Sequence, residues 1–371
     1  MNQEPDWASP PGDTIARLME VKEIGADEMA EAMSISASDF SALIQGCYRI
    51  NLEMAQVLAD NLGSSARFWI ARDKSYVRDL VRIGEASETL ISDWLKSMPI
   101  ASMRKFGIIK KGIRSNETLL NDLLKFFGCI NLQEWGTRYS TGVGAVAFRT
   151  STAFPTDDMA TLVWLRLGEQ LAELQRVNIY NRSLFQNMLP SLKRLSAFKR
   201  PSIFLERLTS ACAEVGVHVT TARAPDGCRA SGASWIHADG NPIVHLSFRH
   251  LSEDHFWFTF FHEAAHIILH EREHIDDDFG VGNSVELEDY EREANAYSHD
   301  ILLSEPLKAQ LLAGGRPTPS AIRRFAREAG VTPGIIVGIL ENDGVIPYGR
   351  LSSMKRRYTW GADLHIPDIK D

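Results

Sequence analysis

Apolar residues recur every three to four positions through most of residues 13–76, which is the spacing of amphipathic helices that bury one face. Turn-forming Gly, Ser and Asn residues interrupt this pattern and divide it into short segments. The predicted helices of this small bundle cover residues 14–22, 27–33, 36–45, 52–62 and 65–76. Residues 1–12 are polar and rich in proline, so we expect them to form a flexible arm.

Residues 77–215 keep a mainly helical pattern without a catalytic motif, which makes them a helical connecting region. After Gly216 apolar and polar residues alternate instead, as they do in strands. The segments with this period are 217–220, 233–238 and 242–247. The last two flank Asp239-Gly240, a hairpin-turn sequence, and helical periodicity then returns. We therefore predict a mainly helical α+β protein whose C-terminal domain, residues 216–371, contains a small β-sheet.

The apolar helical segment that begins at Phe256 holds three ionisable side chains in its middle, His262, Glu263 and His266. Burying such groups without partners costs on the order of several kcal/mol, so their presence needs an explanation. Positions i and i+4 share one helix face about one turn apart, so both imidazoles can reach one cation. This H-E-x-x-H arrangement is half of a zinc hydrolase site. Hydrogen bonding of the three groups without a metal is the alternative for so short a pattern.

A third ligand has to come from another segment, because His270 lies eight residues after His262, about 12 Å along a helix axis. Downstream, Glu291 and Asn295 again stand one turn apart in a helical pattern. A carboxylate can bind the metal there, while an amide one turn later can hydrogen-bond a ligating histidine. We choose Glu291 over Glu293 because the two side chains point about 160° apart around the helix.

His262 to His266, together with Glu291-x-Glu-Ala-Asn295, resembles the ImmA/IrrE group of gluzincin-type metallopeptidases. The resemblance implies that His262, His266 and Glu291 bind Zn²⁺ and that Glu263 is the general base. It also implies a fold in which the small sheet lies beside the zinc helix.

The same resemblance bears on substrate binding. In gluzincin-type peptidases the sheet edge beside the zinc helix takes up the substrate as an added strand, and residues 242–247 resemble that edge. Peptide hydrolysis passes through a tetrahedral intermediate with a negatively charged oxygen, which needs a hydrogen-bond donor. Tyr290, Tyr297 and His299 are unranked candidates for this donor. Between the two ligand segments, residues 270–290 are acidic and contain two glycines, so we expect a flexible loop there.

Residues 25–36 and 37–46 have the small-residue and apolar spacing of a helix-turn-helix, with Phe40 and Leu43 facing the core. They resemble the Xre/Cro-type DNA-binding domain, and the residues that follow resemble its HigA antitoxin branch. The resemblance implies operator DNA as a partner. The candidate contact residues are Ser36, Ser38, Ser41, Gln45 and Arg49, of which Gln45 and Ser38 suit base edges and Arg49 suits phosphate.

Charge leaves an alternative open for this N-terminal module. Residues 1–75 contain 12 acidic and 6 basic residues, whereas phosphate contacts usually need a basic face. A helical module used only for dimer or partner contact is therefore the alternative to DNA binding. We expect a homodimer in either case. The whole chain has a net charge of -8, which argues against a protein surface that is basic overall and binds nucleic acid through its general charge.

The four cysteines are scattered without a C-x-x-C pair, so neither a disulfide framework nor a thiolate zinc site is indicated. No charged leader precedes an apolar core at the N-terminus, and no apolar run approaches the roughly 20 residues of a membrane span. We therefore expect a cytoplasmic protein without a membrane partner.

Two functions from different classes fit these patterns. The first is a zinc-dependent endopeptidase coupled to a DNA-binding regulatory module, which cleaves a repressor or another specific protein in stress, phage or toxin-antitoxin-type regulation. The second is a transcriptional regulator whose peptidase-like domain senses a ligand or partner and has little proteolytic activity. The intact H-E-x-x-H with Glu291 favours the first.

Overall fold

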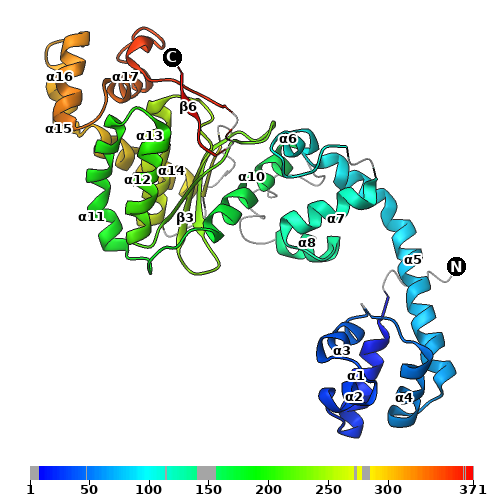
Figure 1. Cartoon of the computed structure of the whole chain (residues 1–371). Helices are drawn as coiled ribbons and strands as arrows, with labels where there is room; N and C mark the ends of the chain where they lie inside the picture. Colours follow the sequence, from blue (N-terminus) through cyan, green and yellow to red (C-terminus); the bar gives the residue numbers. More distant parts are fainter. Residues whose placement is uncertain are drawn as a thin grey trace. The chain divides into compact units, whose positions relative to one another are not determined.

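The computed structural model describes residues 8–46, 48–112, 115–139, 156–270, 274–277, 285–361, 363 and 365–370. The chain divides into two compact units, Met1–Trp94 and Leu95–Asp371, which fold around separate hydrophobic cores. Helices dominate both units, and the described strands belong to the second (Figure 1). This architecture agrees with the mainly helical α+β class predicted from the sequence.

The first unit is a bundle of short helices. Its helices are α1 (Pro11–Lys22), α2 (Ala26–Ala32), α3 (Ala37–Ile44), α4 (Leu52–Leu62) and the start of α5 (Ala66–Ser97). The first four lie within three residues of the predicted segments, whereas α5 continues far beyond residue 76. Two side-chain caps fix where helices begin: Ser36 accepts a hydrogen bond from the backbone N–H of Asp39, and Asn51 accepts one from Met54.

The prediction of a flexible arm over residues 1–12 is wrong at its C-terminal end. Pro11 and Gly12 are buried in the first turn of α1, where proline is favoured because its fixed φ suits that position. A Cβ atom on Gly12 would lie 1.8 Å from the carbonyl oxygen of Ile44, so only glycine allows α1 and α3 to approach there. Residues 1–7 lie outside the described part of the chain.

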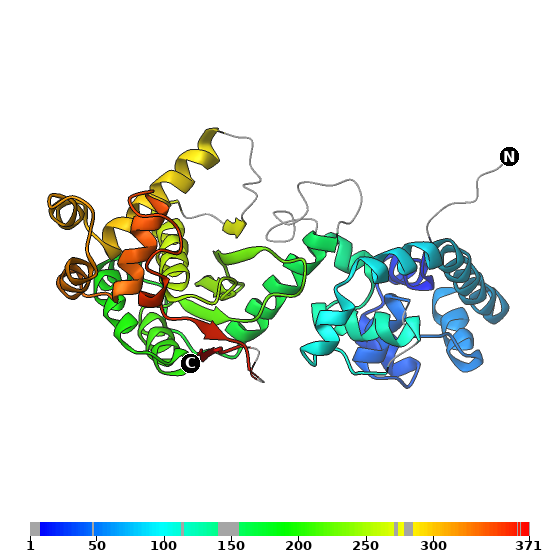
Figure 2. The same ribbon diagram turned by 90° about the horizontal axis from the view of Figure 1, so that it is seen from above.

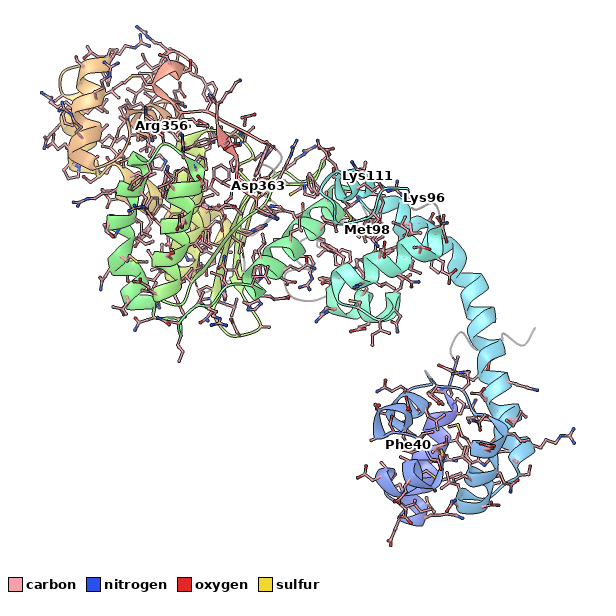
Figure 3. All side chains as sticks on the ribbon, in the orientation of Figure 1. Phe40, Lys96, Met98, Lys111, Arg356 and Asp363 are labelled. Carbon is pink, nitrogen blue, oxygen red and sulfur yellow. The ribbon has the colours of Figure 1, made fainter. Side chains whose placement is uncertain are left out.

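Apolar side chains from every helix of the first unit meet in one core. Phe40 and Leu43 of α3 are buried there, as the helical spacing predicts, and Phe40 is labelled within the bundle in Figure 3. Met29, Leu58 and Trp69 complete the centre of this core. Their burial stabilises the order of the bundle, since each such side chain contributes roughly 1.5–3 kcal/mol when removed from water.

The second unit surrounds a four-stranded sheet with helices. The elements before the sheet are α6 (Ile100–Lys105), α7 (Asn116–Phe127), α8 (Leu132–Tyr139), α10 (Thr156–Glu173), α11 (Arg182–Leu192), η1 (Lys193–Ala197) and α12 (Pro201–Glu214). The strands of the sheet are β1 (His218–Thr221), β2 (Ala230–Ile236), β3 (Pro242–Leu246) and β4 (His274–Asp277). The remaining elements are α13 (Glu253–Leu269), α14 (Val285–Leu302), α15 (Glu305–Leu312), α16 (Pro319–Ala329), α17 (Pro333–Asn342), η2 (Ser352–Met354) and the strand pair β5 (Tyr358–Thr359) and β6 (Asp368–Ile369). Helices α15 and α16 lie apart from the sheet in both views (Figures 1 and 2).

The strand order in the sheet is β1-β3-β2-β4. The predicted hairpin of β2 and β3 is antiparallel, β1 pairs in parallel with β3, and β4 pairs antiparallel with β2. Two expectations are corrected here. Residues 242–247 include the central strand β3, which has partners on both sides and so cannot take up a further strand. Residues 274–277 of the expected flexible loop form β4, because β2 offers them a ladder of backbone partners.

The two faces of the sheet pack on different helices. Val219, Val244 and Leu246 share a core with the aromatic residues of α13. On the opposite face, Trp235 and Ile243 pack with Trp164 and other residues of α10. Side chains alternate between faces along a strand, except in β2, where the register shifts between Ala230 and Gly232.

A buried network ties the C-terminal region to the start of α13. Lys355 donates to Asp254 over 2.6 Å and also to Glu341. Burial tends to raise the pKa of Asp254, but Lys355 and Ser252 lower it below its ordinary value. A Cβ atom on Gly338 would lie 2.5 Å from a carboxylate oxygen of Asp254, so α17 approaches α13 closely. The network therefore fixes one end of the helix that carries the H-E-x-x-H motif.

Glu253, the first residue of α13, also binds the C-terminal region. Its carboxylate accepts hydrogen bonds from the hydroxyl of Thr332 at 2.9 Å and from the backbone N–H of Arg356 at 2.9 Å. Arg356, labelled in Figure 3, also donates to the carbonyl of Ser196.

None of the helices in the described ranges combines enough length and apolar character to cross a lipid bilayer.

Candidate metal centre

Helix α13 lies almost entirely inside the second unit. Ser252 occupies its N-cap position, but its hydroxyl bonds to the side chain of Asp254 and does not accept a hydrogen bond from a backbone N–H. The first turn instead gains acidic residues, Glu253 and Asp254, which suit the positive end of a helix. Aromatic residues in the next turns pack into the core, and this fixes the rotation of the helix.

His262, His266 and Glu291 come together at one point. The Nε2 atoms of the two imidazoles lie 3.0 Å apart. One carboxylate oxygen of Glu291 lies 3.4 Å from Nε2 of His262, and the other lies 3.5 Å from Nε2 of His266. The side chains of both histidines are 3% exposed, while that of Glu291 is 40% exposed. The group is therefore buried on the α13 side and open on the α14 side.

These distances fit a tetrahedral metal ion. Ligand atoms about 2.05 Å from zinc stand about 3.3 Å from one another at the corners of a tetrahedron. The three donor-to-donor distances, 3.0, 3.4 and 3.5 Å, lie on either side of that value. Two imidazoles and one carboxylate are also ligand types that zinc prefers, and three protein ligands leave a fourth position open. His262, His266 and Glu291 can thus hold a divalent ion with little movement.

Glu263 is fully buried and turns its carboxylate toward strand β2. The hydroxyl of Ser234 donates to its Oε2 atom over 2.8 Å. A Cβ atom on Gly232 would lie 2.8 Å from its Oε1 atom, so the glycine makes room for the carboxylate. Sequence reasoning did not find these two residues. The period-two pattern of β2 carries the signal, since it places residues 232 and 234 on the same face.

His270, the next histidine along α13, does not belong to the group formed by His262, His266 and Glu291. Nδ1 of His270 lies 3.8 Å from a carboxylate oxygen of Glu293, and its ring lies 4.3 Å from that of Tyr290. His270, one helical turn after His266, therefore faces Glu293, whereas His262 and His266 face Glu291.

Asn295 lies one turn after Glu291 on α14 and is exposed. In the described part of the chain, no hydrogen bond joins it to the imidazole of His262 or His266. Its expected role in orienting a ligand stays a prediction.

The three expected oxyanion donors lie in different surroundings. The ring of Tyr290 lies tilted against that of His270, with an angle of 45° between the ring planes. Burial raises the pKa of Tyr297, and a hydrogen bond with Gln186 opposes this. Burial lowers the pKa of His299, whose ring packs edge-on against Phe258 with centroids 5.1 Å apart. None of these contacts selects one donor, so this role also stays a prediction.

In the first unit the five candidate DNA contacts are exposed. Ser36 caps α3 and also bonds to the hydroxyl of Ser38. The side-chain amide of Gln45 donates to Ser41 over 3.4 Å. Arg49 lies 3.4 Å from Asp73 and over the ring of Tyr76. Ser36 and Arg49 thus also have structural roles within the bundle.

Comparison with known proteins bears on the second unit. The family model described as the IrrE N-terminal-like domain, of the peptidase M78 family, matches residues 212–337. The matched stretch begins in α12, contains both α13 and α14 and ends in α17, so it includes every candidate ligand. This match supports the ImmA/IrrE part of the resemblance and suggests a metallopeptidase-like domain. No curated protein matches the chain.

Proposed function

We propose that the second unit is a zinc-dependent endopeptidase and that the first unit is a DNA-binding module of the Xre/Cro type. The chain would then cleave a repressor or another specific protein in stress, phage or toxin-antitoxin-type regulation. One observation carries the proposal. Two imidazoles and a carboxylate from α13 and α14 converge with donor distances of 3.0 to 3.5 Å. The match of residues 212–337 to a peptidase family supports it.

His262, His266 and Glu291 would hold the zinc ion. When bound, zinc polarises a peptide carbonyl and makes a water molecule more acidic. Glu263 would take a proton from the attacking water and later give it to the leaving amine nitrogen. Ser234 would hold the carboxylate of Glu263 in place through its 2.8 Å hydrogen bond. The buried setting of Glu263 limits competing contacts with bulk water.

The proposed place for the substrate is the outer edge of β4. Strand β4 stands at one end of the sheet order, and its residue His274 is in register with Ser234 of β2. An extended peptide can add to such an edge through main-chain hydrogen bonds. This assignment replaces residues 242–247, since β3 is enclosed by β1 and β2.

The DNA-binding part rests on the exposed face of α3 and its C-cap residue. Ser38, Ser41 and Gln45 lie on its exposed side and can reach base edges. We expect a selected duplex to bind the full chain and Gln45→Ala to weaken that binding by about 1–3 kcal/mol. Selection of bound duplexes from a random pool tests this. Failure to enrich any sequence would favour a module for protein contacts.

The peptidase proposal is tested by Glu263→Gln, which removes the base and keeps the ligands. Wild type and variant are each co-expressed with the products of neighbouring genes, and the products are compared by mass spectrometry. We expect a cleavage that is present in wild type and absent in the variant. Glu293→Gln on α14 is the matched control and should cleave normally. Identical products for wild type and Glu263→Gln would contradict the proposal.

A further inference from the structure

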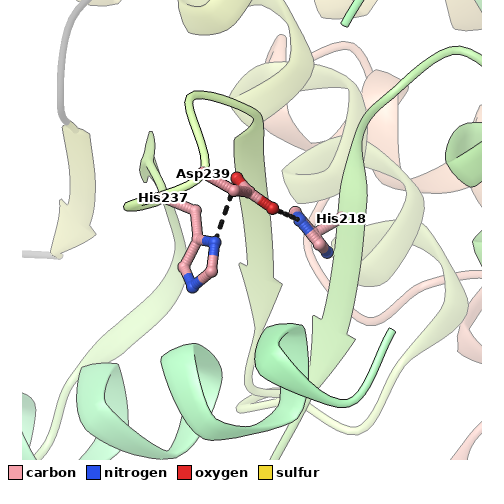
Figure 4. A group of neighbouring side chains, drawn as sticks. All are labelled: His218, His237 and Asp239. Carbon is pink, nitrogen blue, oxygen red and sulfur yellow. Dashed lines mark hydrogen bonds and ion pairs between the residues drawn. The ribbon is translucent and has the colours of Figure 1, made fainter. Parts of the chain in front are cut away.

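A second group of metal-binding side chains lies at the turn between β2 and β3. His218 is the first residue of β1, His237 follows the last residue of β2, and Asp239 lies in the turn itself. The sheet order brings them together: β1 runs parallel to β3, with His218 opposite Ile243, so the turn that precedes β3 stands beside the start of β1. Figure 4 shows both imidazoles facing the one carboxylate.

Two donor distances in this group are close to those around a bound metal ion, and all three donors lie within 4.8 Å of one another. Nε2 of His218 lies 3.1 Å from Oδ2 of Asp239, and Nδ1 of His237 lies 3.0 Å from Oδ1 (Figure 4). Donors around a tetrahedral zinc ion stand about 3.3 Å apart, so outward shifts of a few tenths of an ångström would be enough. The arrangement repeats that of His262, His266 and Glu291, where each carboxylate oxygen also faces one imidazole.

The three side chains are held in place but remain accessible from one side. The side chain of His218 is 1% exposed and that of His237 is 15% exposed, whereas that of Asp239 is 42% exposed. An ion could therefore enter past Asp239 and keep water on its outer face. Nδ1 of His237 is buried and makes no well-aligned hydrogen bond within the described part of the chain, although a carboxylate oxygen is near. A metal ion between these two atoms would give this nitrogen a partner.

The turn itself supports the ligands. The backbone N–H of Asn241 donates to Oδ1 of Asp239 over 2.9 Å, and the N–H of His237 donates to the carbonyl of Asn241 over 2.8 Å. The side chain of Asn241 in turn accepts a hydrogen bond from the backbone of Tyr180 at 3.0 Å. Contacts that orient ligands in this way are typical of metal sites, because they reduce the ordering needed on binding.

This group is separate from the candidate metal centre. Val219, the next residue after His218, packs on the α13 side of the sheet. Because side chains alternate, His218 points to the opposite face, which α10 covers. The two groups therefore lie on opposite sides of the sheet, and binding at one does not require the other.

We propose that His218, His237 and Asp239 bind a second divalent transition-metal ion. Two imidazoles with one carboxylate suit zinc and its neighbours better than calcium or magnesium, which prefer oxygen ligands. The ion joins the β2–β3 turn to the start of β1 and so braces the end of the sheet. It has a structural function and takes no part in peptide cleavage.

The test counts zinc in the full-length protein after dialysis against micromolar zinc. A background of His262→Gln with His266→Gln removes the first centre, and we expect it to keep one zinc ion per chain. Adding His237→Gln should reduce this to none. In the otherwise wild-type protein, Asp239→Asn should lower the zinc content by one ion, and it still offers an oxygen to the N–H of Asn241. Exposed His365 provides the control variant, His365→Gln, which should change nothing.

Cobalt as a probe adds a readout that does not depend on the count. The His262→Gln, His266→Gln background should develop the visible absorption of tetrahedral cobalt, and Asp239→Asn should abolish it. Circular dichroism checks that each variant is folded. A background protein that retains no zinc and gives no cobalt absorption would overturn the proposal. It would mean that Asp239 braces the turn only through its hydrogen bonds with Nε2 of His218 and the backbone N–H of Asn241.

Discussion

The hydroxyl of Ser234 donates a hydrogen bond to the Oε2 atom of Glu263 over 2.8 Å, across the contact between β2 and α13. Glu263 is fully buried, so this contact does not compete with solvent. A strand residue thus holds the side chain that we propose as the base. The activity of the site should depend on the sheet as well as on the two ligand helices.

Replacing Ser234 tests this dependence. Ser234→Ala removes a hydrogen bond to a charged group, an interaction worth about 1.5–3 kcal/mol. We expect kcat for peptide cleavage to fall about tenfold or more with KM and zinc content unchanged, and Ser234→Thr to restore part of it. Ser247→Ala is the control, because this buried hydroxyl bonds to the carbonyl of Ala230 and not to Glu263. Equal activity of Ser234→Ala and wild type would exclude a positioning role.

Gly232 should be needed for the same carboxylate. In Gly232→Ala the new methyl group would lie 2.5 Å from Cγ2 of Thr259 and 2.8 Å from Oε1 of Glu263. Overpacking of this kind costs about 1–3 kcal/mol and should push Glu263 out of place. We expect lower stability in urea denaturation and lower activity with zinc retained. Gly314→Ala, which meets no neighbour within 4 Å, should leave both unchanged.

His245 predicts a specific pH dependence of stability. Burial lowers its pKa to about 3, while a hydrogen bond with Thr220 opposes this only in part. The unfolded chain takes up a proton near pH 6.5, and the folded chain does not until about pH 3. Stability from this group is therefore fully present above pH 6.5 and is lost as the pH falls toward 3, at about 1.4 kcal/mol per pH unit.

The matched variant is His245→Asn, which keeps a polar atom near Thr220 but cannot titrate. Between pH 7 and pH 5 the free energy of unfolding of wild type should fall by about 2 kcal/mol more than that of the variant. Urea denaturation at the two pH values measures the difference. The other histidines contribute equally to both proteins. Equal falls in the free energy of unfolding would therefore show that the folded chain protonates His245 as readily as the unfolded chain does.

The buried ion network at the start of α13 should matter far more than a similar one near the surface. Lys355→Met leaves Asp254 and Glu341 as buried charges without their cation, which should cost about 3–5 kcal/mol. Lys308 pairs with Glu305 and Asp343 but is more exposed. Lys308→Met should cost about 0–1 kcal/mol. Chemical denaturation compares the two variants, and similar losses would contradict this distinction.

Local patterns in the sequence predict much of this fold. The helices of the first unit could be placed because their caps and apolar spacing are contained in short segments. Glu291 could be proposed beside the two imidazoles because the helical period leaves few carboxylates on the required face. The β2–β3 hairpin could be predicted because its turn residues are adjacent in sequence.

Long-range pairing explains what could not be predicted. The acidic residues 274–277 have no strand pattern of their own and become β4 because β2 pairs with them. The central place of β3 depends on β1, which joins it from more than 20 residues away along the chain. The parallel register of these two strands also brings His218 to Asp239, and no local sequence pattern contains that pairing.

The most direct test of the metal centre is a crystal structure of the purified protein with anomalous scattering measured at the zinc edge. We predict a zinc peak within bonding distance of Nε2 of His262, Nε2 of His266 and the carboxylate of Glu291, each about 2.0–2.2 Å away. A protein crystallised with zinc that has no peak between these three side chains would contradict the proposed peptidase.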